Sequence, residues 1–556
     1  MKTQTRPANV WRILTVLLVF VLAACGGGNG GDAGTGGTGG TGGATSPAAA
    51  TSEAAGATGG ATASTGASAA AATTGGADTP QGNAEINISL NADPPKLDPA
   101  VSGALVDRQV LNSLMDKLVD LDAEGNIVPM LATEWQVSDD NLTYTFMLRE
   151  GVKFHDGTDF NADAVKFNLE RGMTETSPRR NELSAVQSIE VVDPKTVKLT
   201  LKEAFAPFLS ILTDRAGMMA SPTAVQELGD DFMTKPVGTG PFKFQDRVKD
   251  TSITLVRNED YWQEGLPKAS RIVYKIFTDA PTALVNLRSG QLDFTDSLPA
   301  KEVPGLQQDA SFKVVNEPGL GYQGFYLNTT KPPFDKKEVR KAVDMLINRD
   351  ALVKVVFGET ATPAHSPFPE TSLAFGESNK YEQPNVEAAK QLLSQAGVSN
   401  PSFTFKTGTS PTTAQIAQLV QNFLQPAGFN MQIEKVEFGT LLDQLEQGNF
   451  EAGAVGWSGR PDPDQNIYDV FATGGPRNDS RYSNPQVDEL LNQARRESDE
   501  AKRKALYDEV MQIAHEEVPY VFLYQPNNVF GMRANVTGFT YVPDGIIRTA
   551  QLNKQQ

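Results

Sequence analysis

The sequence is poor in the side chains that build redox, metal and nucleophilic sites. Its 556 residues include one cysteine, Cys25, and three histidines, His155, His365 and His515. A single cysteine excludes an internal disulfide, and this inventory excludes a zinc or nickel site made of several His and Cys ligands. No serine stands in a G-x-S-x-G turn. We therefore expect no catalytic residues, no bound metal and no cofactor.

Long apolar runs are also scarce, and the one near the N-terminus is short. Ile13 to Leu22 follows a basic segment and leads into Ala23-Ala24-Cys25. About ten apolar residues are too few to span a bilayer comfortably, so residues 1–24 are predicted to be a secretory signal peptide. A small-residue site that ends in cysteine resembles the bacterial lipobox, which implies lipidation at Cys25. An ordinary signal peptide with a chance cysteine is the alternative.

Basic residues are too few to balance the acidic ones. There are 49 Lys and Arg against 67 Asp and Glu, which gives a formal net charge of -18 at pH 7. A nucleic-acid-binding protein needs a basic face against the phosphates, so we expect no nucleic-acid partner. The charge does not argue for or against a small-molecule ligand, because net charge speaks mainly to solubility and non-specific binding.

Large apolar side chains are missing from residues 26–82, which consist mostly of Gly, Ala, Thr and Ser. Such a composition cannot bury a core. Residues 25–83 are therefore predicted to be a disordered tether. From residue 84 onward, strand-like and helix-like patterns alternate, which indicates an α/β protein. The patterns predict strands over 85–90, 142–148, 402–406, 429–436 and 521–524, and helices over 108–118, 161–171, 385–396 and 413–424.

The segment from Gly456 to Asp464, GWSGRPDPD, is the most distinctive loop of the chain. It follows a strand-like segment, FEAGAV, at 450–455. Within nine positions it offers an aromatic ring, a small-residue turn, a guanidinium and two carboxylates. Ends of strands are where rigid scaffolds usually present binding groups, and two prolines stiffen this loop. By itself the loop is compatible with a ligand site, a metal site or a surface turn.

Two short motifs point elsewhere but lack the required context. Asp462, Asp464 and Asn466 stand two apart, as in a calcium loop, but Ile467 and Thr473 occupy the positions that need Gly and Glu. The segment 319–324 matches G-x-G-x-x-G. It runs into a predicted strand, whereas a dinucleotide site needs the N-terminus of a helix there. We read the first as a chance spacing and the second as a close approach of backbones.

Several longer motifs carry a family resemblance. The chain from 84 to 553 resembles the extracellular solute-binding proteins that serve peptide and nickel ABC importers. The matching segments are LATEWQVSDDNLTYTFMLREGVKFHDGTDFNADAVKFNLER, VVDPKTVKLTL, PVGTGPFKF, LRSGQLDF, PPFDKKEVRKAVDMLINRDALV and YSNPQVDELLNQAR, in that order.

The resemblance implies a two-lobed periplasmic-binding-protein type II fold with an extra subdomain in lobe I and a hinged ligand cleft. Lobe I would comprise residues 84–324 and the return segment 525–556, and lobe II residues 325–524. The two crossings between the lobes would form a hinge. Within this fold, the resemblance makes His155 a structural residue of a turn.

Arg460 is the main departure from the family's ligand site. The resemblance implies that di- and oligopeptide binders carry an aspartate at this position, and that this aspartate pairs with the ammonium terminus of the peptide. A guanidinium prefers a carboxylate, so Arg460 is predicted to bind a ligand carboxylate. The alternative is that Arg460 pairs with Asp462 or Asp464 and only shapes the loop. Some dipeptide binders also carry an Arg where Ala414 stands here, which agrees with a relocated carboxylate site.

Other candidate ligand contacts are less specific. Trp457 offers an apolar wall, and Gly459 and Asp462 belong to the same loop as Arg460. Tyr322 and Phe325 precede the domain-crossing segment and line either the cleft or the core. Asp98, in Leu97-Asp98-Pro99, turns the backbone or contacts the ligand.

The prediction is a lipid-anchored receptor of an ABC importer, not an enzyme, that captures peptides or related carboxylate-bearing small molecules. Its partners would be the ligand, a membrane permease complex and the membrane itself through the lipid anchor. We expect a bacterial monomer on the outer face of the cell membrane or in the periplasm. The alternatives are a receptor for a metal chelate, a secreted hydrolase that uses Asp462 and Asp464, and a surface chaperone or adhesin.

Overall fold

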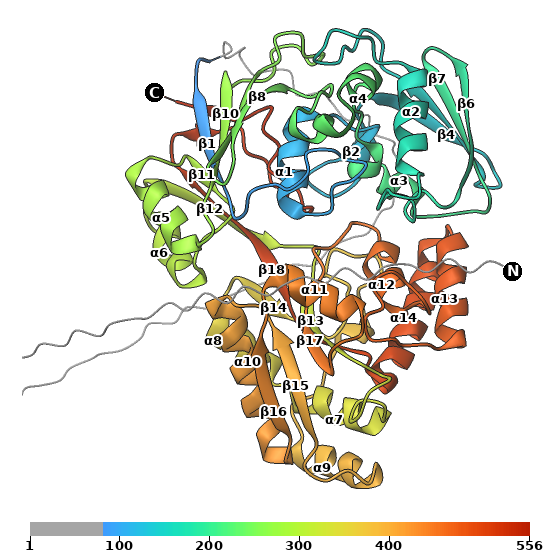
Figure 1. Ribbon diagram of the computed structural model, residues 1–556, viewed down its shortest axis with the longest axis vertical. Helices are drawn as coiled ribbons and strands as arrows, with labels where there is room; N and C mark the ends of the chain where they lie inside the picture. Colours follow the sequence, from blue (N-terminus) through green and yellow to red (C-terminus); the bar gives the residue numbers. More distant parts are fainter. Residues whose placement is uncertain (1–81, 556) are drawn as a thin grey trace, which may run out of the picture. The chain divides into compact units, whose positions relative to one another are not determined.

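The computed structural model describes residues 82–555. The predicted signal peptide, Cys25 and nearly all of the predicted tether therefore lie outside the described residues. Strands and helices alternate along the described chain, in agreement with the predicted α/β class (Figure 1). Across these residues, no helix combines the length and the apolar character needed to cross a bilayer.

The largest sheet has twelve strands and mixes parallel with antiparallel pairs. Its path is β16-β15-β17-β13-β18-β11-β1-β10-β9-β8, and β12 and β14 also pair with β18. The strands are β1 (Glu85–Leu90), β8 (Phe242–Val248), β9 (Ser252–Arg257), β10 (Arg271–Ile276), β11 (Phe294–Thr295), β12 (Phe312–Pro318), β13 (Gln323–Leu327), β14 (Ala361–Pro363), β15 (Ser402–Thr407), β16 (Asn430–Lys435), β17 (Ala452–Ala454) and β18 (Tyr520–Arg533).

Strand β18 belongs to both lobes. Its first residues pair with β13 and β14, and its later residues pair antiparallel with β12, from Pro318 opposite Asn527 to Phe312 opposite Arg533. The strand is continuous across residue 525, where the family resemblance places a boundary between the lobes. Together with the chain from β12 to β13, it makes the two crossings (Figure 1).

A second sheet of four antiparallel strands lies within lobe I. Its order is β4-β5-β7-β6, and α2 packs on β6 and β7. This unit has its own apolar core, which includes Phe146, Leu169 and Val197. The elements are β4 (Ala132–Val137), β5 (Thr143–Leu148), α2 (Ala162–Gly172), β6 (Val186–Asp193) and β7 (Thr196–Leu201).

Separate apolar cores support the rest of the chain. One core joins residues between 86 and 294 to residues between 530 and 552, so the C-terminal segment returns to lobe I. Two further cores use residues between 322 and 524. Tyr322 is part of one of them, so the packing of lobe II begins slightly before residue 325.

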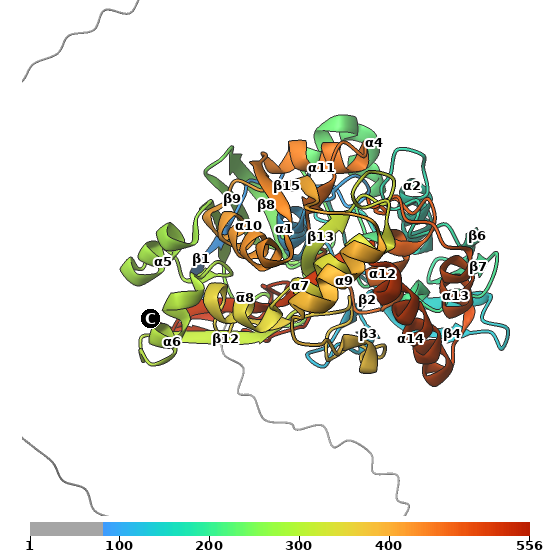
Figure 2. The ribbon, with the colours of Figure 1, turned by 90° about the horizontal axis from the view of Figure 1, so that it is seen from below.

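The remaining elements surround these sheets, with α13 and α14 side by side (Figure 1 and Figure 2). They are α1 (Leu105–Leu114), β2 (Val119–Leu121), β3 (Ile127–Pro129), α3 (Phe208–Ile211), α4 (Pro222–Leu228), α5 (Ala280–Ser289), α6 (Val303–Gln307), α7 (Lys337–Leu346), α8 (Arg349–Val356), α9 (Val386–Gln395), α10 (Pro411–Leu424), α11 (Phe438–Glu446), α12 (Asp464–Phe471), α13 (Pro485–Arg496), α14 (Glu500–Glu517), β19 (Val536–Thr537) and β20 (Asn553–Lys554).

Most of the predicted elements are confirmed to within a few residues. Helix α2 begins after Asn161, whose side chain accepts a hydrogen bond from the N–H of Ala164 (3.0 Å). The G-x-G-x-x-G segment runs into strand β13, as predicted. The helix predicted over 108–118 is wrong in its bounds, since α1 spans 105–114. It ends early because the backbone becomes extended at Met115 and the N–H of Gly240 donates to the carbonyl of Leu114 (2.9 Å).

Candidate ligand-binding site

The loop from 456 to 464 joins β17 to α12 and lies against the chain between β12 and β13. Trp457 and Tyr322 exchange two backbone hydrogen bonds of 2.9 and 3.0 Å. Gly459 has φ +79°, and a Cβ there would lie 2.1 Å from the carbonyl carbon of Leu320. Only glycine fits this left-handed and crowded position. The crossing segment therefore fixes the base of the loop.

Asn466, in the first turn of α12, organises the loop through its side chain. Its Oδ1 accepts hydrogen bonds from the backbone N–H of Arg460 (2.7 Å) and from Nε1 of Trp457 (3.0 Å). Its Nδ2 donates to the carbonyl oxygen of Arg460 (2.8 Å). The two-apart spacing of Asp462, Asp464 and Asn466 resembled a calcium loop, but in the fold Asn466 is a loop-holding residue. In the described part of the chain, no group of three or more His, Cys, Asp or Glu side chains could hold a metal ion.

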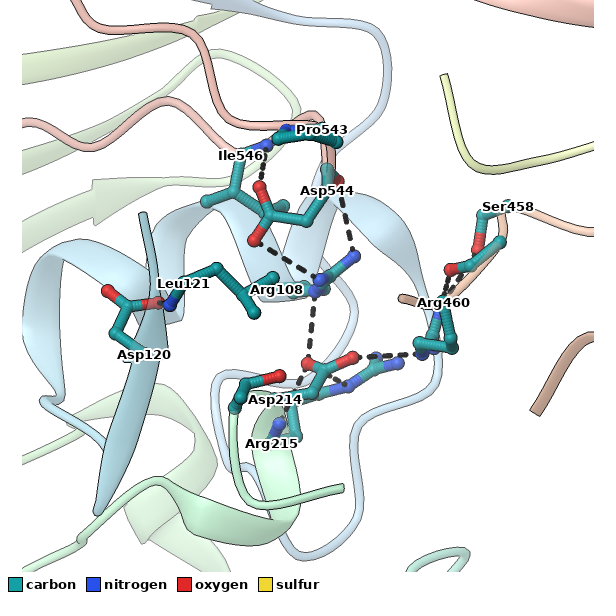
Figure 3. Close-up of polar contacts among 12 residues, drawn as sticks. Arg108, Asp120, Leu121, Asp214, Arg215, Ser458, Arg460, Pro543, Asp544 and Ile546 are labelled. Carbon is teal, nitrogen blue, oxygen red and sulfur yellow. Dashed lines mark hydrogen bonds and ion pairs between the residues drawn. The ribbon is translucent and has the colours of Figure 1, made fainter. Parts of the chain in front are cut away.

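Arg460 is only 6% exposed and turns its guanidinium toward lobe I. Its Nε lies 3.0 Å from Oδ2 of Asp214, which makes an ion pair between the two lobes (Figure 3). The pair is close in distance but is not aligned as a hydrogen bond. Nη1 of Arg460 donates to the carbonyl of Gly459 (2.6 Å), and its guanidinium lies 4.8 Å from the ring centre of Trp457. The guanidinium is thus held at the lobe interface.

Asp214 stands among several guanidinium groups of lobe I. Its Oδ1 accepts a hydrogen bond from the backbone N–H of Arg215 (2.7 Å) and lies 3.0 Å from Nε of Arg108 (Figure 3). Burial by itself would raise the pKa of Asp214, but Arg108, Arg460 and Arg215 lower it well below its ordinary value. Burial, together with Arg108 and Arg215, lowers the pKa of Arg460 to about 9 despite the attraction of Asp214. Three guanidinium groups thus surround this one carboxylate, and Arg108 also lies 3.6 Å from Asp544.

The two carboxylates of the loop are already paired with arginines of lobe II. Asp462 receives hydrogen bonds of 2.6 and 2.7 Å from Arg503, and Asp464 receives bonds of 2.9 and 3.0 Å from Arg495. Arg460 contacts neither carboxylate, so the alternative in which it pairs with Asp462 or Asp464 is wrong. Because both carboxylates are held in bidentate pairs, they are poorly placed to act as the acid and base of a hydrolase.

A small cavity of about 50 Å³ lies where the lobes meet. Ser210 Oγ donates to Gln465 Oε1 across the interface (3.1 Å), and the N–H of Ala206 donates to the carbonyl of Arg495 (2.7 Å). Sites for small molecules usually measure several hundred Å³, so the lobes must separate before a peptide-sized ligand enters. The cavity is lined by Asn181, Glu182, Phe205 and Ile211 of lobe I and by Trp457, Arg460, Asp464, Gln465, Asp469 and Arg495 of lobe II.

The fold distributes the other predicted site residues between the loop and the core. Trp457 lines the cavity. Tyr322 and Phe325 are buried in lobe II, where the Tyr322 hydroxyl donates to the carbonyl of Asn466 (3.1 Å). Asp98 is buried in lobe I, where Arg171 binds both of its oxygens and the N–H of Ala100 donates to one of them.

Several residues around the loop carry no signal in the sequence. Asp214, the partner of Arg460, and the cavity residues Glu182 and Asp469 stand in ordinary helical or turn segments without a motif around them. Only their placement in space shows that they face the loop. Arg495 lies inside the matched segment YSNPQVDELLNQAR, but the motif does not reveal that its partner is Asp464.

These features define the class of the protein. Two α/β lobes joined by two chain crossings, which meet over a charged cavity, are the architecture of a binding protein that closes around its ligand. The model of the bacterial extracellular solute-binding proteins of family 5 matches residues 126–479. The chain belongs to this family of extracellular solute-binding proteins.

Individual relatives agree over most of the chain. Glutathione-binding protein GsiB of Escherichia coli O1:K1 / APEC is 34% identical over 474 residues, which cover 83% of this chain and 92% of the relative. The solved structure of DppA from Helicobacter pylori in complex with the peptide STSA is 30% identical, with a TM-score of 0.78, over 85% of this chain and 98% of that one. AgaA from A. tumefaciens R10, in complex with agropinic acid, is 27% identical, with a TM-score of 0.77, over 85% and 99%. The predicted family and the two-lobed fold class are confirmed.

Proposed function

We propose that the protein is the lipid-anchored receptor of an ABC importer, and that it captures peptides or related carboxylate-bearing small molecules for a membrane permease. The observation that carries the ligand class is Arg460, a buried guanidinium at the lobe interface whose pKa is lowered by burial and by the neighbouring Arg108 and Arg215. The names of the relatives support it, because glutathione, a tetrapeptide and agropinic acid all carry carboxyl groups.

The ligand is captured because it binds the closed state of the lobes more tightly than the open state, and no covalent bond is made or broken. When the lobes separate, Arg460 leaves Asp214, which keeps Arg108 and Arg215 as partners. A ligand carboxylate then binds the free guanidinium. Closure removes water and strengthens this pair, and a ligand shifts the lobe equilibrium only by its preference for the closed form.

The test is calorimetric titration of the purified protein with reduced glutathione and with the peptide Ser-Thr-Ser-Ala. We expect Arg460→Ala to weaken binding by about tenfold or more, since a hydrogen bond to a charged group contributes about 1.5–3 kcal/mol. Blocking the ligand's carboxyl groups as amides or esters should weaken binding to the wild type but change little in the variant.

Arg496→Ala is the matched control. Arg496 also forms a pair between the lobes, 2.7 Å from Glu203, but both side chains are more than half exposed. An exposed pair contributes little, so this variant should bind as the wild type does. Equal affinity of the Arg460 variant and the wild type would refute the role of Arg460. Failure of every carboxylate-bearing probe to bind the wild type would refute the ligand class.

For the anchor, we infer lipidation at Cys25 from the lipobox-like Leu22-Ala23-Ala24-Cys25. Cells that express the protein and are fed radioactive palmitate should incorporate label into the wild type and leave Cys25→Ser unlabelled. The variant should also leave the membrane fraction. Labelling of the serine variant, or an unlabelled wild type, would refute the anchor while leaving the ligand proposal intact.

A further inference from the structure

Asp469 is the one carboxylate of the interlobe cavity that makes no ion pair and accepts no hydrogen bond within residues 82–555. It lies on α12, five residues or about one and a half turns after Asp464, and on the lobe II side of the cavity. Asp462 and Asp464 are each held by an arginine of their own. A half-buried carboxylate without a partner is costly, so the site is suited to receive a donor.

The neighbours of Asp469 leave its negative charge uncompensated. Asp464 and Glu182 add further negative charge, and the nearby cations are Arg495 and Arg477. Arg495 is engaged by Asp464 in a bidentate pair, and Arg477 lies 4.6 Å from the ring centre of Trp457. Burial, with the charges of Asp464 and Glu182, raises the pKa of Asp469 to about 6. The environment therefore favours either a proton or a positively charged ligand group at this carboxylate.

Unsatisfied donors lie near Asp214, the interlobe partner of Arg460. Arg179 and Arg215 are 6% and 4% exposed, and the Nε of each has no acceptor among the described residues. Both contribute to the field around Asp214, beside Arg460 and Arg108. Within the part of the chain that the structure describes, two arginine donors near Asp214 thus lack an acceptor, whereas the carboxylate of Asp469 lacks a donor. The two ends of the site thus differ in sign.

We propose that the site recognises a zwitterionic ligand, whose carboxylate binds Arg460 and whose free ammonium group binds Asp469. This inference rests on the proposed function and adds the amino end of the ligand. The family resemblance places the aspartate that binds the ligand's ammonium group in the loop, at the position of Arg460. In this chain the loop carries the cation, Arg460, and the proposed anion, Asp469, lies on the following helix. The bound molecule would then lie with its amino end toward α12.

The experiment compares reduced glutathione and Ser-Thr-Ser-Ala with their N-acetylated forms, titrated into the wild type, Asp469→Asn and Asp479→Asn. Asp479 is a matched control, because it is a half-buried aspartate of lobe II whose pKa burial also raises to about 6, and it does not line the cavity. We expect Asp469→Asn to bind the free-amine probes about tenfold more weakly, and Asp479→Asn to bind them as the wild type does. N-acetylation should weaken binding to the wild type and have no further effect in Asp469→Asn.

A second readout is the pH dependence of affinity. The carboxylate of Asp469 must be charged to hold an ammonium group, so affinity for the free-amine probes should fall when the pH is lowered from 7 to 5. The groups that face Asp469 are Asp464, Glu182, Arg495 and Arg477, and they remain in the variant. The affinity of Asp469→Asn should therefore show a smaller change than that of the wild type over this range.

The outcomes separate the two proposals. If the free-amine probes bind the wild type, but Asp469→Asn binds them equally tightly or N-acetylation has no effect, the ammonium site is refuted and the carboxylate receptor stands. If neither form of either probe binds the wild type, the proposed ligand class and the ammonium site both fall. A melting temperature of Asp469→Asn at or above that of the wild type would show that any loss of binding is not a loss of folding.

Discussion

At the scale of single residues, Arg460 illustrates how one side chain combines a loop and an interface. The sequence shows that a cation replaces the family's anion in the loop. The fold adds that this cation is buried, stacked on Trp457 and paired with Asp214 of the other lobe. The pair makes Arg460 a contact of the closed state as well as a candidate ligand group, so the ligand must compete with Asp214 for it.

His155 has a structural environment that requires its neutral form. The N–H of Gly238 donates to Nδ1 (3.3 Å), and Nε2 lies 2.9 Å from the carbonyl of Gly240, to which it donates. Protonation of Nδ1 would destroy its acceptor role. Burial, with a smaller contribution from the charge of Lys243, lowers the pKa of His155 to about 4, while the bond to Gly240 and the charge of Asp156 oppose the shift. This geometry explains why a histidine in this turn need not be catalytic.

We predict that His155 stays neutral in the folded protein down to about pH 4. Its pKa in the unfolded chain is about 6.5, so the unfolded state binds more protons and stability falls as the pH drops from 6.5 toward 4. The loss from this group is at most ~3 kcal/mol, at 1.36 kcal/mol per pKa unit. Titration of the imidazole signals by NMR checks the value, with the urea-unfolded protein as the reference. A folded-state midpoint near 6.5 would contradict the prediction.

At the scale of elements, the loop from 456 to 464 depends on glycine at one point. Gly459 and Gly474 both have positive φ, +79° and +72°, but they differ in surroundings. A Cβ at 459 would collide with the backbone of Leu320, whereas a Cβ at 474 would have no heavy atom within 4 Å. An alanine at 474 therefore tests only the free-energy cost of the left-handed backbone, whereas an alanine at 459 adds the cost of the steric clash.

We expect Gly474→Ala to lower the free energy of unfolding by about 1 kcal/mol, which is the order of the cost of a left-handed conformation for a residue with a Cβ. Gly459→Ala should cost ~2 kcal/mol or more, because the loop or the crossing segment must also move. Urea unfolding measures both. Equal losses would mean that the crossing segment does not support the loop, and that the close approach of the two backbones has no energetic consequence.

Strand β18 is the element that couples the lobes. It pairs with β13 and β14 in one half and with β11 and β12 in the other, so it is a hydrogen-bonded link between the lobes. The apolar return strand was expected from the sequence only over 521–524, whereas the strand continues to Arg533. The extension came from pairing with β12, which local patterns do not show.

At the scale of the whole described chain, the site exists only because two lobes meet. The cavity takes residues from 181–211 on one side and from 457–495 on the other. Hydrogen bonds and ion pairs cross the interface at Asp214, Ser210 and Ala206. These contacts are few and largely polar, which suits an interface that must open, because a large apolar interface would resist separation.

The sequence by itself determined the family, the α/β class and the identity of the loop that holds Arg460. Those features reside in short motifs, local periodicity and composition, which do not depend on distant contacts. The predicted C-terminal bound of α1 was wrong because it depends on a distant contact. The carbonyl of Leu114, the last residue of the helix, accepts a hydrogen bond from the N–H of Gly240.

Only the tertiary structure decided the partners of the charged side chains. It paired Arg460 with Asp214, Asp462 with Arg503 and Asp464 with Arg495, and it left Asp469 facing the cavity without a partner. It also placed Tyr322 and Phe325 in the core. Electrostatic partners are set by distance and burial in the packed lobes, and neither quantity is encoded in the spacing of residues along the chain.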